Sequence, residues 1–279
     1  MKKGMKNICV LIRVYDRIDD LAYNLKIIRD TWVQNSYSIV VVFNGQQCGY
    51  KLPPIINVLA DNILILGENA GHLKGNSQLL LEGLKHIQLS VFDYVIILEA
   101  DTWLYTDQLI SKYVGKLEAS DAVWASARWY DRFYSLATDF AIIKSSYLKT
   151  NSAIFDFATY PECYVCNYLL NHGQKYIWIH ENMNVQLPSY IRKFPFAPMG
   201  RFYAFPASKM VTHHIEQLKY GMRTKKRHFN IAAKCNYFVD ESHSMIYLYI
   251  MNLYMQFSHL IDRCFLRRSW YSKRKVLNL

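Results

Sequence analysis

The sequence predicts an α/β protein with a mostly parallel central sheet flanked by helices, and three observations support this fold class. Apolar runs of strand length alternate with stretches of helical periodicity through the first hundred residues, a pattern typical of parallel sheets. The run at 94–98 is apolar at every position, as expected for a central strand covered on both faces. Each run also ends in polar residues, and the carboxyl edge of such a sheet is where ligands bind.

The order of the elements follows from their hydrophobic periodicity and from the glycines that end them. The predicted elements of the first half are a strand at 7–14, a helix at 18–32, strands at 38–45 and 62–71 that each include a polar turn, a helix at 75–88 and a strand at 93–98.

The second half is less regular. Strands are predicted at 121–128 and 138–144, and residues 160–179 read as a helix, a stop at Gly173 and a strand. Residues 180–212 contain four prolines and are predicted as loops that cover the site.

Length and composition limit the classes of protein to which the chain can belong. The chain has 279 residues with 52% hydrophobic residues, which fits one large folded domain and argues against disorder. The start has no uninterrupted apolar run, since Arg13 and Asp16 break it, so we expect no secretory signal. Six scattered cysteines without a second close pair indicate reduced thiols in a cytoplasmic protein rather than a zinc site.

The basic charge is concentrated near the carboxyl terminus. Of a net charge of +11, residues 223–228 contribute +4 and residues 262–279 contribute +5. Residues 245–261 are nearly all apolar and precede the basic stretch RRSWYSKRK. This combination predicts an amphipathic helix that lies in the interface of an anionic membrane. The alternative is a helix packed on the protein's own core with a solvated basic tail.

Two carboxylates follow the most apolar of the predicted strands. Glu99 and Asp101 stand two positions apart, directly after residues 94–98. On a turn, two acids at this spacing can share one divalent cation, and oxygen ligands suit Mg²⁺ or Mn²⁺. Such a cation would neutralise a diphosphate leaving group. The alternative is that one acid caps a helix and the other is solvated.

A buried strand followed by acid-x-acid, in an α/β domain of this size, resembles the nucleotide-sugar glycosyltransferases of the A-type fold (GT-A), particularly the inverting enzymes similar to family 2. The family pattern is Asp-x-Asp, whereas this chain has Glu-Ala-Asp at 99–101. The resemblance implies a GT-A-like protein with Mn²⁺ or Mg²⁺ as cofactor. It also implies that Asp101 is the stronger metal contact and that Glu99 contacts metal or donor.

The resemblance further implies a donor site at the ends of the first three strands. The residues it assigns to nucleotide-sugar binding there are Arg13, Asp16, Asn44, Asn69, Gly71 and Lys74, together with Glu99. Lys74 could reach a phosphate, although an exposed lysine at a helix start is an equally good interpretation.

Downstream, family members often carry an acidic pair that opens a helix. Counting back from Gly173 places this pair at Pro161 and Glu162, so the first acid is missing. The resemblance implies that Glu162 is the general base, which takes the proton from the acceptor hydroxyl. Asp139 is the second candidate for this role, or it binds the acceptor. The helix dipole alone would also favour an acid at the position of Glu162.

Two adjacent histidines, His213 and His214, lie in VTHHIEQ. Some A-type enzymes add a carboxy-terminal histidine to the metal or to the diphosphate. Neighbouring side chains point to opposite faces of a strand, so at most one of the two would serve.

Together these features predict a catalytic domain at 1–240, with a nucleotide-binding part at about 5–105 and an acceptor part at about 106–240, and a membrane-associating tail at 241–279. The expected reaction is inverting, metal-dependent transfer from a nucleotide-diphosphate sugar to a glycan or glycolipid. The expected setting is bacterial surface polysaccharide or lipopolysaccharide assembly, peripheral on the inner face of the cell membrane.

Other functions fit less well. We expect no nucleic-acid partner, because basic groups that bind nucleic acid would have no reason to accompany an acid-x-acid loop. A nucleotidyltransferase would usually have a glycine-rich loop after the first strand, and LIRVYDRIDD contains no glycine. A non-catalytic membrane-associated adaptor on a decayed transferase fold stays open, since decay would also produce Glu-Ala-Asp and the missing acid at Pro161.

Overall fold

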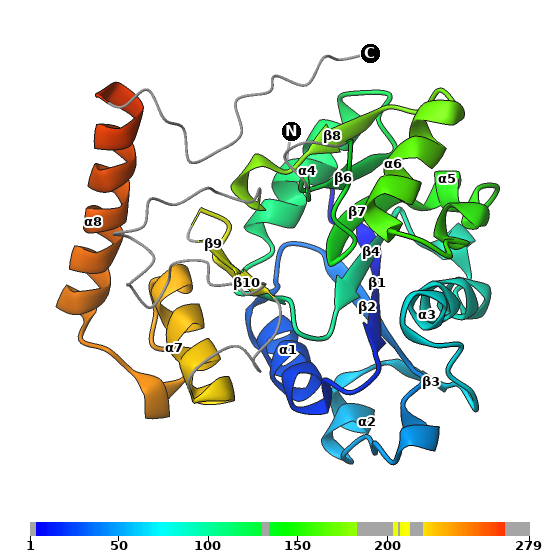
Figure 1. Ribbon diagram of the computed structural model, residues 1–279, viewed down its shortest axis with the longest axis horizontal. Helices are drawn as coiled ribbons and strands as arrows, with labels where there is room; N and C mark the ends of the chain where they lie inside the picture. Colours follow the sequence, from blue (N-terminus) through cyan, green and yellow to red (C-terminus); the bar gives the residue numbers. More distant parts are fainter. Residues whose placement is uncertain (1–3, 130–133, 183–202, 206, 213–219, 266–279) are drawn as a thin grey trace. The chain divides into compact units, whose positions relative to one another are not determined.

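The computed structural model describes residues 4–129, 134–182, 203–205, 207–212 and 220–265 (Figure 1). The chain divides into two compact units, the first formed mainly by residues 1–101 and 106–179 and the second by residues 102–105 and 180–277. Residues 106–179, assigned above to the acceptor part, therefore share a unit with the nucleotide-binding part.

The first unit is built on a seven-stranded sheet with the order β3-β2-β1-β4-β7-β6-β8. Its strands are β1 (Asn7–Val14), β2 (Ser36–Phe43), β3 (Asn62–Ile65), β4 (Tyr94–Glu99), β6 (Trp124–Ser126), β7 (Phe140–Lys144) and β8 (Tyr176–Trp178). Only β7, among these strands, runs antiparallel to its neighbours β4 and β6. The predicted mostly parallel sheet is confirmed.

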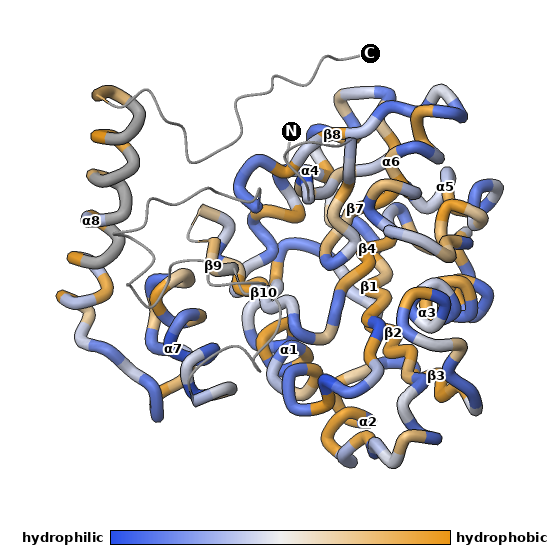
Figure 2. Tube along the Cα trace, in the orientation of Figure 1, coloured by the Kyte–Doolittle hydropathy of each residue, from blue (hydrophilic) through white to orange (hydrophobic). Residues whose placement is uncertain are grey.

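Helices cover both faces of this sheet (Figure 1). One side carries α1 (Ile18–Thr31) and α4 (Gln108–Glu118), and the other carries α3 (His72–His86) and α6 (Pro161–Asn171). The short α2 (Ile55–Leu59) packs against α1, and α5 (Ser145–Leu148) follows β7. The central strands are consequently buried, and the apolar colouring of β1, β2 and β4 shows why these residues form the core (Figure 2).

The predicted elements of this unit are confirmed, with shifts of a few residues at their ends. β2 begins at Ser36 rather than at 38, and α3 begins at His72 rather than at 75. Gly173 follows α6 with a φ of +63°, a conformation that glycine adopts without strain. The predicted helix, glycine stop and strand are thus all present.

The second unit contains a small antiparallel sheet that the sequence analysis missed. Strands β5 (Trp103–Leu104), β10 (Met210–Thr212) and β9 (Tyr203–Phe205) pair in that order. The expectation of loops over 180–212 is therefore wrong for β9 and β10, which are too short to show a period-2 pattern and depend on pairing with β5. The rings of Trp103, Phe229 and Phe238 form its core, with centroids 5.5 to 5.8 Å apart.

Two helices complete the second unit, α7 (Gly221–Ala233) and α8 (Met245–Cys264). The predicted helix at 245–261 is confirmed by α8. Within the described part of the chain, none of the helices has both the length and the apolar character that a membrane span requires.

Candidate functional site

The carboxyl ends of β1 and β4 carry a buried ion pair. Arg13 and Glu99 are register partners on these parallel strands. Arg13 Nη2 donates to Glu99 Oε1 at 2.5 Å and to Thr138 Oγ1 at 3.4 Å. The Arg13 side chain is 3% exposed and that of Glu99 is 25% exposed. Two predicted site residues therefore meet, and Thr138 is a partner that the sequence analysis missed.

Hydrogen bonds hold the backbone around Glu99 from two sides. Asn24 Nδ2, on α1, donates to the carbonyl oxygens of Glu99 and Ala100, each at 3.2 Å. The Glu99 N–H donates to the Asp139 carbonyl at 2.9 Å. Asn24 is fully buried and was also missed, although a polar residue on the apolar face of the predicted helix was a signal for it.

Glu162 lies in the first turn of α6, directly after Pro161. Its carbonyl accepts a hydrogen bond from the Leu136 N–H at 3.0 Å, which ties the segment before β7 to this helix. Burial raises the pKa of Glu162 to about 7, and its own backbone N–H opposes this by stabilising the carboxylate.

Charges nearby also act on Glu162. The carboxylates of Glu99 and Asp139 raise its pKa, whereas Arg13 lowers it. The structure thus brings four predicted residues into one electrostatic group, the Arg13 cluster (Arg13, Glu99, Asp139 and Glu162). Glu162 was placed by counting along the sequence, and the fold brings it into electrostatic interaction with Glu99, the last residue of β4.

Asp101 and Asp139 are the most buried acids of the site, 5% and 6% exposed. Asp139 Oδ1 accepts the Phe140 N–H at 3.0 Å. Among the described residues, no three His, Cys, Asp or Glu side chains gather in a way that could hold a metal ion. His213 and His214 lie outside the described residues.

The loop after β3 and the first turns of α3 lie against the end of β2. Asn44 Nδ2 donates to the Gly75 carbonyl at 3.2 Å and to Gln78 Oε1 at 3.4 Å. Asn69 Oδ1 accepts the Gly71 N–H at 2.8 Å. A Cβ atom on Gly75 would overlap Asn69 Oδ1 and lie 3.3 Å from Asn44 Nδ2. Gly75 therefore permits this approach, and it too was missed, although a glycine inside a helical pattern pointed to it.

The other residues predicted to bind the nucleotide sugar lie at the same edge of the sheet but make fewer contacts. Gly71 precedes α3 with φ +93° and ψ −176°, a combination that only glycine adopts readily. Asp16 and Lys74 are exposed, in the loop after β1 and on the first turn of α3. Neither has a described contact with the Arg13 cluster.

Two tyrosines form an exposed aromatic pair beside these loops. Tyr15 follows β1 directly and Tyr50 lies in the loop after β2, with ring centroids 5.4 Å apart at 71°. Each is 37% exposed. A hydrogen bond with Cys48 raises the pKa of Tyr15 to about 12, so its hydroxyl stays neutral. An aromatic surface thus faces solvent at the carboxyl ends of β1 and β2.

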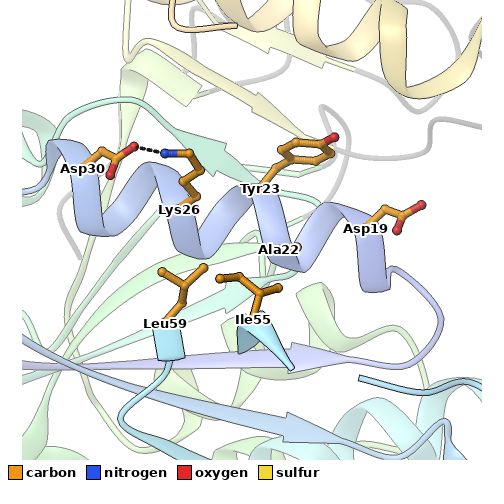
Figure 3. A pocket seen from close by; sticks show the side chains of 7 residues that line it. All are labelled: Asp19, Ala22, Tyr23, Lys26, Asp30, Ile55 and Leu59. Carbon is orange, nitrogen blue, oxygen red and sulfur yellow. Dashed lines mark hydrogen bonds and ion pairs between the residues drawn. The ribbon is translucent and has the colours of Figure 1, made fainter. Parts of the chain in front are cut away.

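A separate hollow of about 410 Å³ lies along the outer side of α1 (Figure 3). Its lining residues are Asp19, Ala22, Tyr23, Lys26, Asp30, Ile55 and Leu59. Lys26 Nζ and Asp30 Oδ2 form an ion pair of 2.8 Å across one helical turn. None of the predicted site residues lines this hollow, so it is distinct from the candidate site.

Solved structures share this architecture. The mannosyltransferase PcManGT from Pyrobaculum calidifontis, solved in complex with GDP-Man and Mn²⁺, superposes with a TM-score of 0.52 at 12% identity. The match covers 83% of this chain and 64% of that one. The fold is that of an A-type glycosyltransferase.

Other A-type transferases are similar with lower scores. The catalytic domain of Drosophila beta1,4-galactosyltransferase 7 has a TM-score of 0.41 at 10% identity, over 62% of this chain and 65% of that one. Mouse xyloside xylosyltransferase 1 has a TM-score of 0.43 at 8% identity, over 68% and 89%. No family model matches the chain, and no curated protein matches its sequence. The superposition with the mannosyltransferase confirms the A-type fold, and the link to family 2 stays a prediction.

Proposed function

We propose that the protein is a glycosyltransferase that moves a sugar from a nucleotide-diphosphate sugar to a hydroxyl group of a glycan or glycolipid. Glu162 carries the proposal, because it is the member of the Arg13 cluster whose pKa is raised to about 7, at the carboxyl edge of an A-type transferase sheet. A group whose pKa lies near the working pH is suited to accept a proton.

In the proposed reaction, the Glu162 carboxylate accepts the proton of the acceptor hydroxyl. The hydroxyl oxygen forms a bond to the anomeric carbon as the bond from that carbon to the phosphate oxygen breaks. The nucleoside diphosphate leaves with the bonding electrons, and attack opposite the leaving group inverts the configuration. Arg13 Nη1 is buried without a hydrogen-bond partner among the described residues, so we propose that it donates to a hydroxyl of the sugar.

The donor nucleotide would occupy the ends of β1 to β3. We propose that its base lies against Tyr15 and Tyr50, because exposed aromatic rings stack on nucleobases. The closed loop of Asn44, Asn69 and Gly75 would form the wall of this site.

A divalent cation fits the donor set in part. Asp101 offers a buried hard oxygen ligand, whereas the Glu99 carboxylate is paired with Arg13. We therefore propose that Asp101 holds Mn²⁺ or Mg²⁺ and that the donor's phosphates and water supply the other ligands, as is usual for Mg²⁺. When bound, the cation would neutralise the departing diphosphate. The Mn²⁺ and GDP-Man of the mannosyltransferase support this proposal.

Our proposal for the acceptor and for the cellular setting rests on the sequence pattern. The basic carboxy-terminal region favours an acceptor at the inner face of a bacterial cell membrane, as in surface polysaccharide or lipopolysaccharide assembly. A second candidate, a non-catalytic adaptor, is favoured by the ion pair of Glu99 with Arg13, which occupies one acid of the motif.

A thermal-shift panel distinguishes these functions. UDP, GDP, CDP, CMP and dTDP would be tested with and without Mn²⁺ on the wild type, on Asp101→Ala and on the surface control Asp121→Ala, whose side chain is 89% exposed. A ligand that binds only the folded state raises the melting temperature. We expect a Mn²⁺-dependent shift with one nucleotide that only Asp101→Ala loses. No shift with any nucleotide in the folded wild type would favour the adaptor.

A further inference from the structure

Helix α8 exposes several large apolar side chains on one side. Seven large apolar side chains on it are 45% to 72% exposed: Met245, Ile246, Tyr249, Ile250, Leu253, Phe257 and Leu260. At 3.6 residues per turn they all fall within about 140° of the helix circumference. Figure 2 shows the repeated apolar positions along α8. Large apolar side chains gathered in the open on one side of a helix indicate an interaction site.

Hydrogen bonds hold the segment that connects α7 to α8, so the start of α8 is anchored. Ser244 caps the helix by accepting the Tyr247 N–H at 3.1 Å. The Asn236 side chain bonds the backbone of His243 twice, at 2.8 and 3.1 Å. Leu248 is 1% exposed and anchors the opposite side of the first turns.

The same connection is fixed to α7 by a buried acid. Glu241, 9% exposed at its side chain, forms 2.7 Å ion pairs with Arg223 and Arg227. Asn230 on α7 bonds the carbonyl oxygens of Phe238 and Glu241 at 3.0 and 3.1 Å. These contacts anchor the start of α8 to α7, and the seven apolar side chains remain exposed in the part of the chain that the structure describes.

We propose that this exposed face of α8 docks into the interface of an anionic lipid bilayer, with the helix lying in the plane of the membrane. The seven side chains include no charged group, as insertion among acyl chains requires. The stretch that follows, RRSWYSKRK, contributes five basic residues and no acid, which suits anionic headgroups. This inference is independent of the donor chemistry proposed above.

Charge favours a bilayer over a second copy of the chain. Each copy carries a net charge of +11, so two copies repel each other. An anionic bilayer neutralises the same charges. Leu253 and Phe257, one turn apart near the middle of the exposed face, should insert most deeply.

Sedimentation with vesicles tests the proposal on the full chain. The probes are vesicles of zwitterionic phosphatidylcholine alone and vesicles with about a third anionic phosphatidylglycerol. The test variant is Leu253→Glu with Phe257→Glu, and the matched control is Val58→Glu on α2, whose side chain is 77% exposed. Circular dichroism and thermal unfolding establish that each variant is folded.

We expect the wild type and the control to bind anionic vesicles and the α8 variant to bind at least tenfold more weakly. Replacing Arg267 and Arg268 by Gln should weaken binding about fivefold for each charge removed, and high salt should release the protein. Equal binding by the α8 variant, or no binding by the wild type, would overturn the proposal. A wild-type dimer that the α8 variant converts to a monomer would instead assign the face to a second copy.

Discussion

Arg13 and Glu99 lie opposite each other on the parallel strands β1 and β4, and their side chains form an ion pair of 2.5 Å in which Arg13 is almost fully buried. This pair places a fixed cation among the carboxylates of Glu99, Asp139 and Glu162. Without it, three acids would share a poorly hydrated site, which is unfavourable. Arg13 therefore supports both the fold and the ionisation of the candidate site.

Replacing Arg13 by Met should lower the free energy of unfolding by about 3 kcal/mol, because Glu99 would lose its partner in a partly buried place. The double variant Arg13→Met with Glu99→Met should recover much of this loss, since it leaves no unpaired charge. Urea unfolding of the wild type, both single variants and the double variant measures the coupling. Strictly additive losses would show that the pair contributes no interaction energy.

Glu162 should make the folded state less stable at high pH. Its pKa in the folded protein is about 7, above its ordinary value of 4.5, so the folded state binds this proton more tightly than the unfolded chain. The stability that the proton contributes is present below pH 4.5 and is lost as pH rises through 7.

Glu162→Gln should consequently stabilise the protein at pH 8 by up to about 3 kcal/mol, because the variant has no buried charge to form. At pH 4.5 the gain should vanish. Melting temperatures at the two pH values test this, with Glu82→Gln, an acid of α3 that pairs with Lys85, as the control. An equal effect of Glu162→Gln at both pH values would contradict the raised pKa.

The same pKa sets the pH dependence of transfer. Glu162 can accept a proton only when it is ionised. The value of kcat/KM should therefore fall about tenfold per pH unit below pH 7 and level off above it. Glu162→Gln should reduce transfer by about 10²- to 10⁴-fold, with nucleotide binding little changed. A variant that retains full transfer would reassign the base, with Asp139 as the next candidate.

Gly75→Ala should destabilise the protein, although a change from glycine to alanine usually stabilises a helix. Alanine normally stabilises a helix by about 1 kcal/mol relative to glycine. Here the added Cβ overlaps Asn69 Oδ1, so we expect a net loss of about 1–3 kcal/mol and weaker nucleotide binding. Adding Asn69→Ala removes the overlapping atom and should restore part of the stability. If the double variant is no better, the overlap is not the cause.

Tyr50→Ala should weaken nucleotide binding by about 1–3 kcal/mol, the usual contribution of base–aromatic stacking. Tyr50→Phe keeps the ring and should bind nearly as well as the wild type. Isothermal titration with the nucleotide identified by the thermal-shift panel measures both. Unchanged affinity in Tyr50→Ala would remove this residue from the base site.

Local patterns in the sequence are sufficient to predict the sheet and the edge at which the site lies. Buried strands such as β1 and β4 are recognisable because they are covered on both faces and therefore apolar along most of their length. Polar residues at the carboxyl ends of parallel strands must gather at one edge, so the sequence is sufficient to predict that Arg13, Glu99 and Asn44 lie at the same edge of the sheet. The periodicity of α8 is equally local.

Tertiary structure decided how these residues meet. Which residues of β1 and β4 are partners depends on strand register, and the burial that raises the pKa of Glu162 comes from segments distant in the chain. Asn24, Thr138 and Gly75 acquire their roles only through such contacts. A local pattern marks Asn24 and Gly75 as unusual, but it cannot assign their partners. The main strands of the first unit and the chemistry at their ends follow from the sequence alone, because periodicity and composition act within a segment. Strand pairing, the burial of Glu162 and the short strands β5, β9 and β10 were decided by the fold, because they depend on which segments pack together.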